Sequence, residues 1–188
     1  MPDLHIAQDP AADEVLSRDP FALLSGMLLD QQFPMERAFA GPAKILERFG
    51  SLDPADIAAA DPERFAELCS TPPAIHRFPG SMAARVQSLA AHVVEEYGGR
   101  TERLWEEAGS GKELMKRLQA LPGFGKQKAQ IFVALLGKQL GVRPEGWAEV
   151  AGSYADEGSY RSVADVVDAG SLDKVRAFKK EQKAAARR

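Results

Sequence analysis

The sequence predicts an all-α fold, and three kinds of observation support this prediction. Apolar residues recur every three or four positions over most of the chain, which is typical of amphipathic helices. The pairs Asp19-Pro20, Asp53-Pro54 and Asp61-Pro62 each combine an N-cap residue with a proline in the first helical turn. No stretch alternates apolar and polar residues over the length of a strand, so no sheet competes with this prediction.

These patterns place the helices in order along the chain. Proline or glycine marks several of the breaks, such as Pro34 before one helix and Gly50 at the C-cap of the same helix. The predicted helices cover residues 11–17, 21–32, 35–49, 54–59, 62–69, 82–97, 147–151, 162–167 and 171–186, with two more inside residues 112–136. Leu104 and Trp105 are expected to anchor a short segment in the core before residue 112.

Composition bounds the class of protein. The chain has 188 residues, of which 45% are hydrophobic, and no apolar run is long enough to span a membrane. The first residues are acidic and lack the pattern of a secretion signal. Cys69 is the single cysteine, which excludes an internal disulfide and fits a reducing compartment. We therefore expect a cytoplasmic protein without a membrane partner.

Charge is distributed unevenly. The net charge of −3 argues mildly against a nucleic-acid partner. Residues 111–143, however, hold seven lysines and arginines against one acid, Glu113, whereas residues 1–20 hold five acids against Arg18. A basic band on an acidic body is the pattern expected for contact with a DNA backbone. The same band on two solvated helices would also favour solubility.

The most informative stretch is Leu121-Pro122-Gly123-Phe124-Gly125-Lys126, between two helices with apolar stripes. Pro122 prevents continuation of the first helix, and the two glycines flank one apolar residue that can hold the turn in the core. Glycines allow close approach of a bulky partner, and the next helix begins with unpaired N–H groups, which suit an anion such as a DNA phosphate. The alternative is a buried helical hairpin that binds no ligand.

Residues 121–125, followed by Lys126, Gln127, Lys128 and Ala129, resemble the helix-hairpin-helix of the HhH-GPD superfamily of base-excision DNA glycosylases. A second match lies about 90 residues upstream, where Leu28-Leu29-Asp30-Gln31-Gln32 resembles the helix end that carries glutamine at the DNA in this family. The resemblance implies that Gln32 enters the stack left by a rotated base. It implies DNA contacts for Gln31, Gln32, Gly123, Phe124, Gly125, Lys126 and Lys128. Helix-capping amides are the alternative for the glutamines.

The resemblance also implies an architecture. We expect a helical barrel with its helix-hairpin-helix over residues 21–137, with the hairpin at 121–126, and a second small helical lobe formed by residues 1–20 together with 138–188. The cleft between the lobes would hold the substrate base. One cysteine cannot bind the iron–sulfur cluster of many relatives. A sodium or potassium ion held by the backbone carbonyls of Gln119, Leu121 and Phe124 is the cofactor that the resemblance leaves open.

Two positions of the family's chemistry differ in this chain. The lysine that forms an imine in bifunctional relatives is replaced by Gln127, whose amide cannot attack C1′. Lys128 would reach the pocket only if the helix register shifted by one residue. The carboxylate position falls on or within a residue of Glu145, with Glu149 and Asp156 as further candidates. Alternatively, Glu145 is a solvated loop residue.

Trp147 and Gln127 are candidate pocket residues, although Trp147 could equally fill the core. His76, Arg77 and Ser81, before the helix at 82–97, are either pocket contacts or turn and capping residues.

Two functions follow, and the sequence leaves both open. The first is a monofunctional DNA N-glycosylase that removes a damaged or mispaired base from double-stranded DNA, acting as a monomer at the nucleoid. The second is a non-catalytic helix-hairpin-helix protein that recognises damaged or branched DNA. A helical interaction module whose hairpin meets protein is a third option. The sequence does not indicate which base would be handled.

Overall fold

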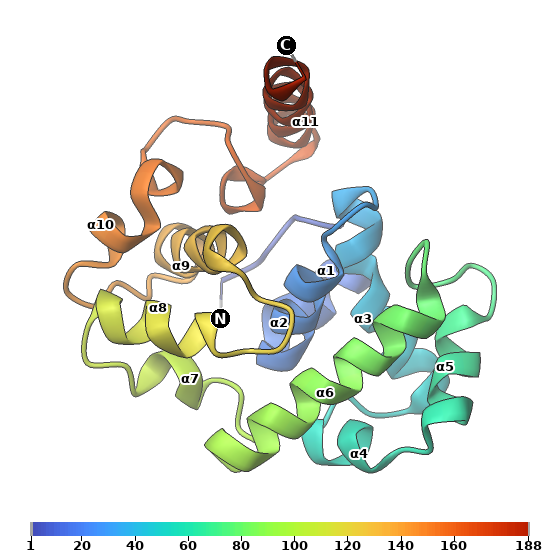
Figure 1. Ribbon diagram of the computed structural model, residues 1–188. Helices are drawn as coiled ribbons and strands as arrows, with labels where there is room; N and C mark the ends of the chain where they lie inside the picture. Colours follow the sequence, from blue (N-terminus) through green and yellow to red (C-terminus); the bar gives the residue numbers. More distant parts are fainter. Residues whose placement is uncertain (1, 188) are drawn as a thin grey trace.

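The computed structural model describes residues 2–187, and these form helices and loops without a strand (Figure 1). The all-α prediction is therefore confirmed. The elements are α1 (Pro10–Arg18), α2 (Pro20–Leu29), α3 (Met35–Phe49), α4 (Pro54–Ala59), α5 (Pro62–Ser70), α6 (Pro79–Tyr97), α7 (Arg103–Glu106), α8 (Gly111–Gln119), α9 (Lys126–Gln139), α10 (Trp147–Ala151), the 3-10 helices η1 (Gly152–Ala155) and η2 (Val163–Asp165), and α11 (Ala169–Ala186). None of the helices in these residues combines the length and apolar character that crossing a bilayer requires.

The three Asp-Pro pairs begin helices as predicted. The Asp19 carboxylate accepts hydrogen bonds from the N–H groups of Phe21 and Ala22 at the start of α2. Asp53 and Asp61 cap α4 and α5 in the same way. A side-chain oxygen at the N-cap accepts hydrogen bonds from amides that have no partner inside the helix. The proline that follows has no N–H group and therefore needs no acceptor.

Helix α2 is the centre of the fold. Every residue from Phe21 to Leu29 is buried, which matches a segment without a single charge. It packs against α3 and α6, and α4 and α5 cover another side of α6. The long diagonal of α6 is visible in Figure 1, with α4 and α5 beside it. Burial on all faces fixes the position of the α2 C-terminal end, from which residues 30–32 continue.

Several predicted boundaries shift. Helix α2 ends at Leu29 rather than at Gln32, because Asp30 leaves the helical conformation (φ −76°, ψ 69°) and Gln32 takes a positive φ of 53°. Helix α6 begins at Pro79, three residues earlier than predicted. Only a 3-10 turn, η2, forms within the predicted helix 162–167. Trp105 is buried beside Phe132, as expected for a core residue.

The C-terminal third is built on α9. Helix α10 and both 3-10 helices pack against α9, and α11 is attached mainly through η2. Helix α1 packs on α2 and α3. One continuous cluster of buried apolar side chains runs from Leu4 to Val175. The division into residues 21–137 and a second lobe stays a prediction.

Candidate nucleic-acid interface and base cleft

The turn between α8 and α9 is held by its apolar residues. Leu121 and Phe124 are buried, and the Phe124 ring meets Phe132 of α9 edge-on at 6.3 Å between ring centroids. The N–H of Phe124 donates to the Leu121 carbonyl at 3.1 Å. The Phe124 side chain therefore faces the core and not a ligand, so any DNA contact at this position must come from its backbone.

The remaining amides of the hairpin are open. Gly123, Gly125, Lys126 and Gln127 are exposed. Their N–H groups donate to no acceptor within residues 2–187, and no side chain caps the start of α9. Exposed amides at the positive end of a helix form a ready site for an anion. These amides are therefore not buried, in contrast to the alternative of a buried helical hairpin.

The hairpin is fixed to the end of α2. Gly123 has a φ of +83°, and a Cβ at this position would lie 2.6 Å from Cδ1 of Leu28. The Lys128 ammonium donates to the carbonyls of Met27 and Leu28, at 2.8 and 3.0 Å. The loop between α8 and α9 accordingly reaches toward α2 in Figure 1. The phosphate-binding candidate thus contacts the end of α2 directly, just before residues 30–32.

Lys126 and Lys128 differ in environment although they are two residues apart. Lys126 is exposed at the first position of α9. Lys128 points inward, where burial lowers the pKa of its ammonium to about 8, an effect that the nearby Asp30 carboxylate opposes. A cation at the C-terminal end of α2 also offsets the negative end of that helix dipole. The expected phosphate contact of Lys128 is therefore not supported by its orientation, because its donors bind α2.

Gln31 and Gln32 also take different roles. The Gln31 amide donates to the Leu28 carbonyl at 2.9 Å and accepts from Arg85 of α6 at 3.2 Å. The buried His76 ring lies 2.8 Å from the Gln31 carbonyl oxygen. Gln32 is exposed, and its side chain makes no hydrogen bond to any described residue. Gln32 is thus the exposed glutamine of the pair, whereas Gln31 is held by contacts with Leu28, His76 and Arg85.

A cleft of about 1110 Å³ opens beside these residues. Its walls come from residues 30–35 after α2, from α9, from η1 and from α11, and they include Asp30, Gln32, Gln127, Ile131, Tyr154, Arg161 and Lys179. The Gln127 amide donates to the Tyr154 hydroxyl at 2.9 Å across this space. A smaller hollow of about 520 Å³ beside α1 is lined by four acids, Asp3, Asp9, Asp13 and Glu14, and by Arg18 and His5, so that acids outnumber bases there.

The structure does not bring Glu145 into this cleft. The chain after α9 folds back, with the Val142 N–H donating to the Leu136 carbonyl. The Glu145 carbonyl accepts from Gly111 at the start of α8, and the Glu145 side chain is exposed. Glu149 and Asp156 are exposed as well and lie outside the cleft walls. Trp147, also outside the cleft, packs on Gly137 and under the Arg143 guanidinium. Of the sequence candidates for the pocket, only Gln127 lines it.

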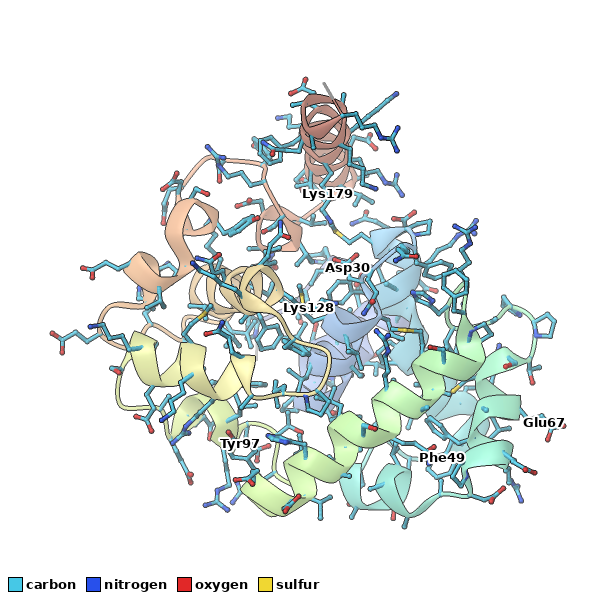
Figure 2. The ribbon with its side chains drawn as sticks, viewed as in Figure 1. Asp30, Phe49, Glu67, Tyr97, Lys128 and Lys179 are labelled. Atoms are coloured by element: carbon cyan, nitrogen blue, oxygen red, sulfur yellow. The ribbon has the colours of Figure 1, made fainter. Side chains whose placement is uncertain are left out.

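Asp30 is the carboxylate that the cleft does contain. Its side chain is 9% exposed and lies 3.8 Å from the Lys179 ammonium of α11. Figure 2 shows Asp30 between Lys179 and Lys128. Burial raises the pKa of the Asp30 carboxyl, and the two lysines lower it in part. The sequence motif that ends in Gln31 and Gln32 includes this residue but does not assign it a role. The signal that could have identified it is a charge placed directly after an uncharged, fully buried helix.

Helix α11 supplies a basic wall. Its cleft-lining side chains include the four cations Arg176, Lys179, Lys180 and Lys183, and Arg187 follows at its C-cap. The residues from Lys180 to Arg187 are exposed on all sides of the helix. Because no apolar face holds this end against the body, its charges are available to a polyanion.

The monovalent cation that the resemblance suggested would need hairpin carbonyls that accept no other hydrogen bond. The Leu121 carbonyl accepts from Phe124, whereas those of Gln119 and Phe124 accept no hydrogen bond from residues 2–187. Two carbonyls of the expected three are therefore unpaired, and the cation stays a prediction.

Comparison with known protein families agrees with this geometry. No curated protein and no solved structure matches the chain. Residues 25–188 match the family described as HhH-GPD superfamily base excision DNA repair protein, a range that includes the α2 terminus, the hairpin and α11. The chain therefore belongs to the HhH-GPD superfamily of base excision DNA repair proteins.

Proposed function

We propose that this protein is a monofunctional DNA N-glycosylase that acts on a damaged or mispaired base rotated out of double-stranded DNA. One observation carries the proposal: the first turn of α9 offers open amides to a phosphate and, through Gln127, also lines the cleft. A backbone held at these amides would therefore present a nucleotide to the cleft. An extruded base requires such a pocket beside the duplex.

The surrounding residues divide the work of binding. The amides of Gly123 and Gly125 and the Lys126 ammonium would hold phosphates on one side of the cleft. Gln32, exposed and without an internal partner, would fill the gap left in the base stack. The basic face of α11 would contact the backbone on the opposite side. Such contacts release counterions, so affinity should fall steeply with salt.

Hydrolysis without strand scission follows from the residue types at the cleft. An imine with C1′ requires an amine nucleophile, and Gln127 supplies an amide instead. Lys128, which follows Gln127 by one residue on α9, donates its ammonium to the carbonyls of Met27 and Leu28. We therefore propose that water, and not a side chain, attacks C1′.

A second candidate is a non-catalytic protein that recognises damaged or branched DNA. The exposed position of Glu145 outside the cleft favours it, because the carboxylate inferred from the family's spacing cannot act there. Both candidates predict duplex binding through the hairpin. They differ in whether a base is released.

The test is base release from defined lesions. Purified protein is incubated with duplexes that each carry one damaged or mispaired base, and hot alkali then cleaves any abasic site formed. We expect cleavage of at least one lesion duplex after alkali, none before it, and no covalent complex after borohydride reduction. Binding to all duplexes without any base release would support the second candidate, and an undamaged duplex serves as the control.

A further inference from the structure

We propose that Asp30 is the carboxylate that stabilises the positive charge on the deoxyribose as the base leaves. This inference rests on the proposed glycosylase function and assigns the catalytic carboxylate to a residue outside the segment that follows the hairpin. Asp30 lines the cleft, and its side chain is 9% exposed. A carboxylate in such a poorly solvated wall interacts more strongly with a nearby cation than one in water does.

The placement of Asp30 does not serve the fold in the way that other aspartates do. Aspartates elsewhere in residues 2–187 accept hydrogen bonds from amides at the N-terminal ends of helices, among them Asp9, Asp19, Asp53, Asp61 and Asp168. Asp30 instead lies at the C-terminal end of α2, where the helix dipole disfavours a negative charge. Its carboxylate accepts no hydrogen bond from residues 2–187. A buried carboxylate that accepts no hydrogen bond and lies at the negative end of a helix dipole is typical of a functional site.

The charges around Asp30 keep it available to a ligand. Lys128 of α9 approaches Asp30 from the α2 side, where its ammonium donates to the carbonyls of Met27 and Leu28. Lys179 of α11 approaches from the other side at 3.8 Å, longer than a hydrogen bond, and its side chain is 40% exposed. Glu36 of α3 is the nearby acid. A DNA phosphate would compete for Lys179, which would turn the Asp30 charge toward the bound nucleotide.

The chemical step balances with water as the co-reactant. The C1′–N bond breaks and its electron pair leaves with the base, so that positive charge develops at C1′ and O4′. The Asp30 carboxylate stabilises this charge. Water forms the new C1′–O bond, and the proton it loses passes to Asp30 and then through solvent to the released base. No electron donor or acceptor is required.

The experiment uses two unreactive duplexes that need no knowledge of the lesion. One carries a neutral tetrahydrofuran abasic analogue, and the other a pyrrolidine analogue whose protonated nitrogen imitates the charged sugar. We expect the wild-type protein to bind the pyrrolidine duplex roughly tenfold or more tightly, since a nearby opposite charge in a cleft is worth at least that much. Asp30→Asn should lose this preference and keep its affinity for the tetrahydrofuran duplex within about twofold.

Glu145→Gln provides the matched comparison, because it neutralises the carboxylate that the family's spacing would choose. We expect it to retain the preference for the pyrrolidine duplex. Retention of the preference by Asp30→Asn, or its loss in Glu145→Gln, would overturn the assignment. Equal wild-type affinity for both duplexes would overturn it as well.

A second measurement does not depend on a variant that folds. The wild-type preference should disappear at low pH as the carboxylate is protonated, while binding to the tetrahydrofuran duplex persists; a preference unchanged across the titration would contradict the assignment. The outcome is separable from that of the proposed function. Absence of base release from every lesion duplex rejects the glycosylase, whereas the charge preference concerns Asp30 alone.

Discussion

A Cβ on Gly123 would lie 2.6 Å from Cδ1 of Leu28, so the hairpin touches α2 with no space for a side chain. Asp30 and Gln32 lie two and four residues after Leu28 in the sequence. The close approach therefore couples the amides that would hold a phosphate to the residues that would meet the extruded nucleotide. Substitutions in the hairpin and in the residues after α2 can therefore show which residues contribute to stability and which contribute to DNA binding.

Gly123→Ala should mainly reduce stability, whereas Gly125→Ala should mainly reduce DNA affinity. Gly123 combines a φ of +83° with the Leu28 contact, so Gly123→Ala should lower the free energy of unfolding by about 1–3 kcal/mol. Gly125 has a φ of −85° and open space where a methyl group would stand, so Gly125→Ala should change stability by less than about 1 kcal/mol. The added methyl group would nevertheless lie where the phosphate approaches. Urea unfolding and duplex titrations of both variants measure the two effects. Unaltered DNA affinity in Gly125→Ala would argue against the hairpin as the binding surface.

Lys126 and Lys128 should differ in their effect on salt dependence. Lys126→Ala removes an exposed cation, so duplex affinity should fall for all sequences and the slope of log K against log salt should decrease by about 1. Lys128→Ala should leave that slope unchanged, since its ammonium binds α2 carbonyls. Titrations at several salt concentrations measure both slopes. Equal slope changes in the two variants would show that Lys128 also meets phosphate.

Gln32→Gly should stabilise the protein while impairing its function. Gln32 holds a φ of 53°, a conformation that costs a residue with a side chain about 1 kcal/mol and glycine almost nothing. Gln32→Ala keeps this cost but also removes the amide, and so serves as the matched variant. Both should slow base release by roughly tenfold or more, because extruding a base costs a few kcal/mol that the amide would help to offset. Single-turnover rates and thermal unfolding check the two expectations. Full activity in both variants would exclude Gln32 from the stack.

Most helices, and the starts of those that follow an Asp-Pro pair, were predictable because local chemistry determines them. Asp19, Asp53 and Asp61 cap the helices that follow, and the apolar stripe around Leu118 and Leu121 lies in the core. The hairpin amides were predictable for the same reason, since proline and glycine act within a few residues. The family was also identified correctly from these motifs.

The wall of the cleft was harder to predict because it depends on contacts between distant segments. Counting residues from the hairpin leads to Glu145, but the turn after α9 directs that residue toward α8. Asp30 and Lys179 lie 149 positions apart in the sequence and meet only after α11 has been placed. No local pattern distinguishes a lysine that binds phosphate from one, such as Lys128, that binds a helix end.

Lys128 should make stability depend on pH in the alkaline range. Its pKa is lowered from 10.5 to about 8, so between these values the unfolded chain binds a proton that the folded protein does not. The free energy of unfolding should therefore rise with pH across this window and lose that contribution as pH falls through about 8. Lys128→Met, which keeps the apolar stem, should lack this rise. Urea unfolding from about pH 7.5 to about pH 10 compares the two proteins, and parallel curves would contradict the buried position of the ammonium.

Asp30→Asn should remove base release while making the fold as stable as the wild type or more so. Burial raises the pKa of the Asp30 carboxyl, so the folded protein keeps this proton to a higher pH than the unfolded chain does, and stability is lost as pH rises from the ordinary value of 3.8 through the folded-state pKa. Asparagine is neutral throughout and escapes this loss. At pH 7 the variant should therefore melt at an equal or higher temperature, by up to about 4 °C for a change of about 1 kcal/mol in a chain of this size. The difference should shrink toward pH 4. Thermal unfolding over this range, with Asp173→Asn on the exposed face of α11 as a control for loss of one acid, measures it. A marked loss of stability at pH 7 in Asp30→Asn would instead show that Asp30 holds α11 to the body through Lys179, because an ion pair that stabilises the fold cannot be removed without cost.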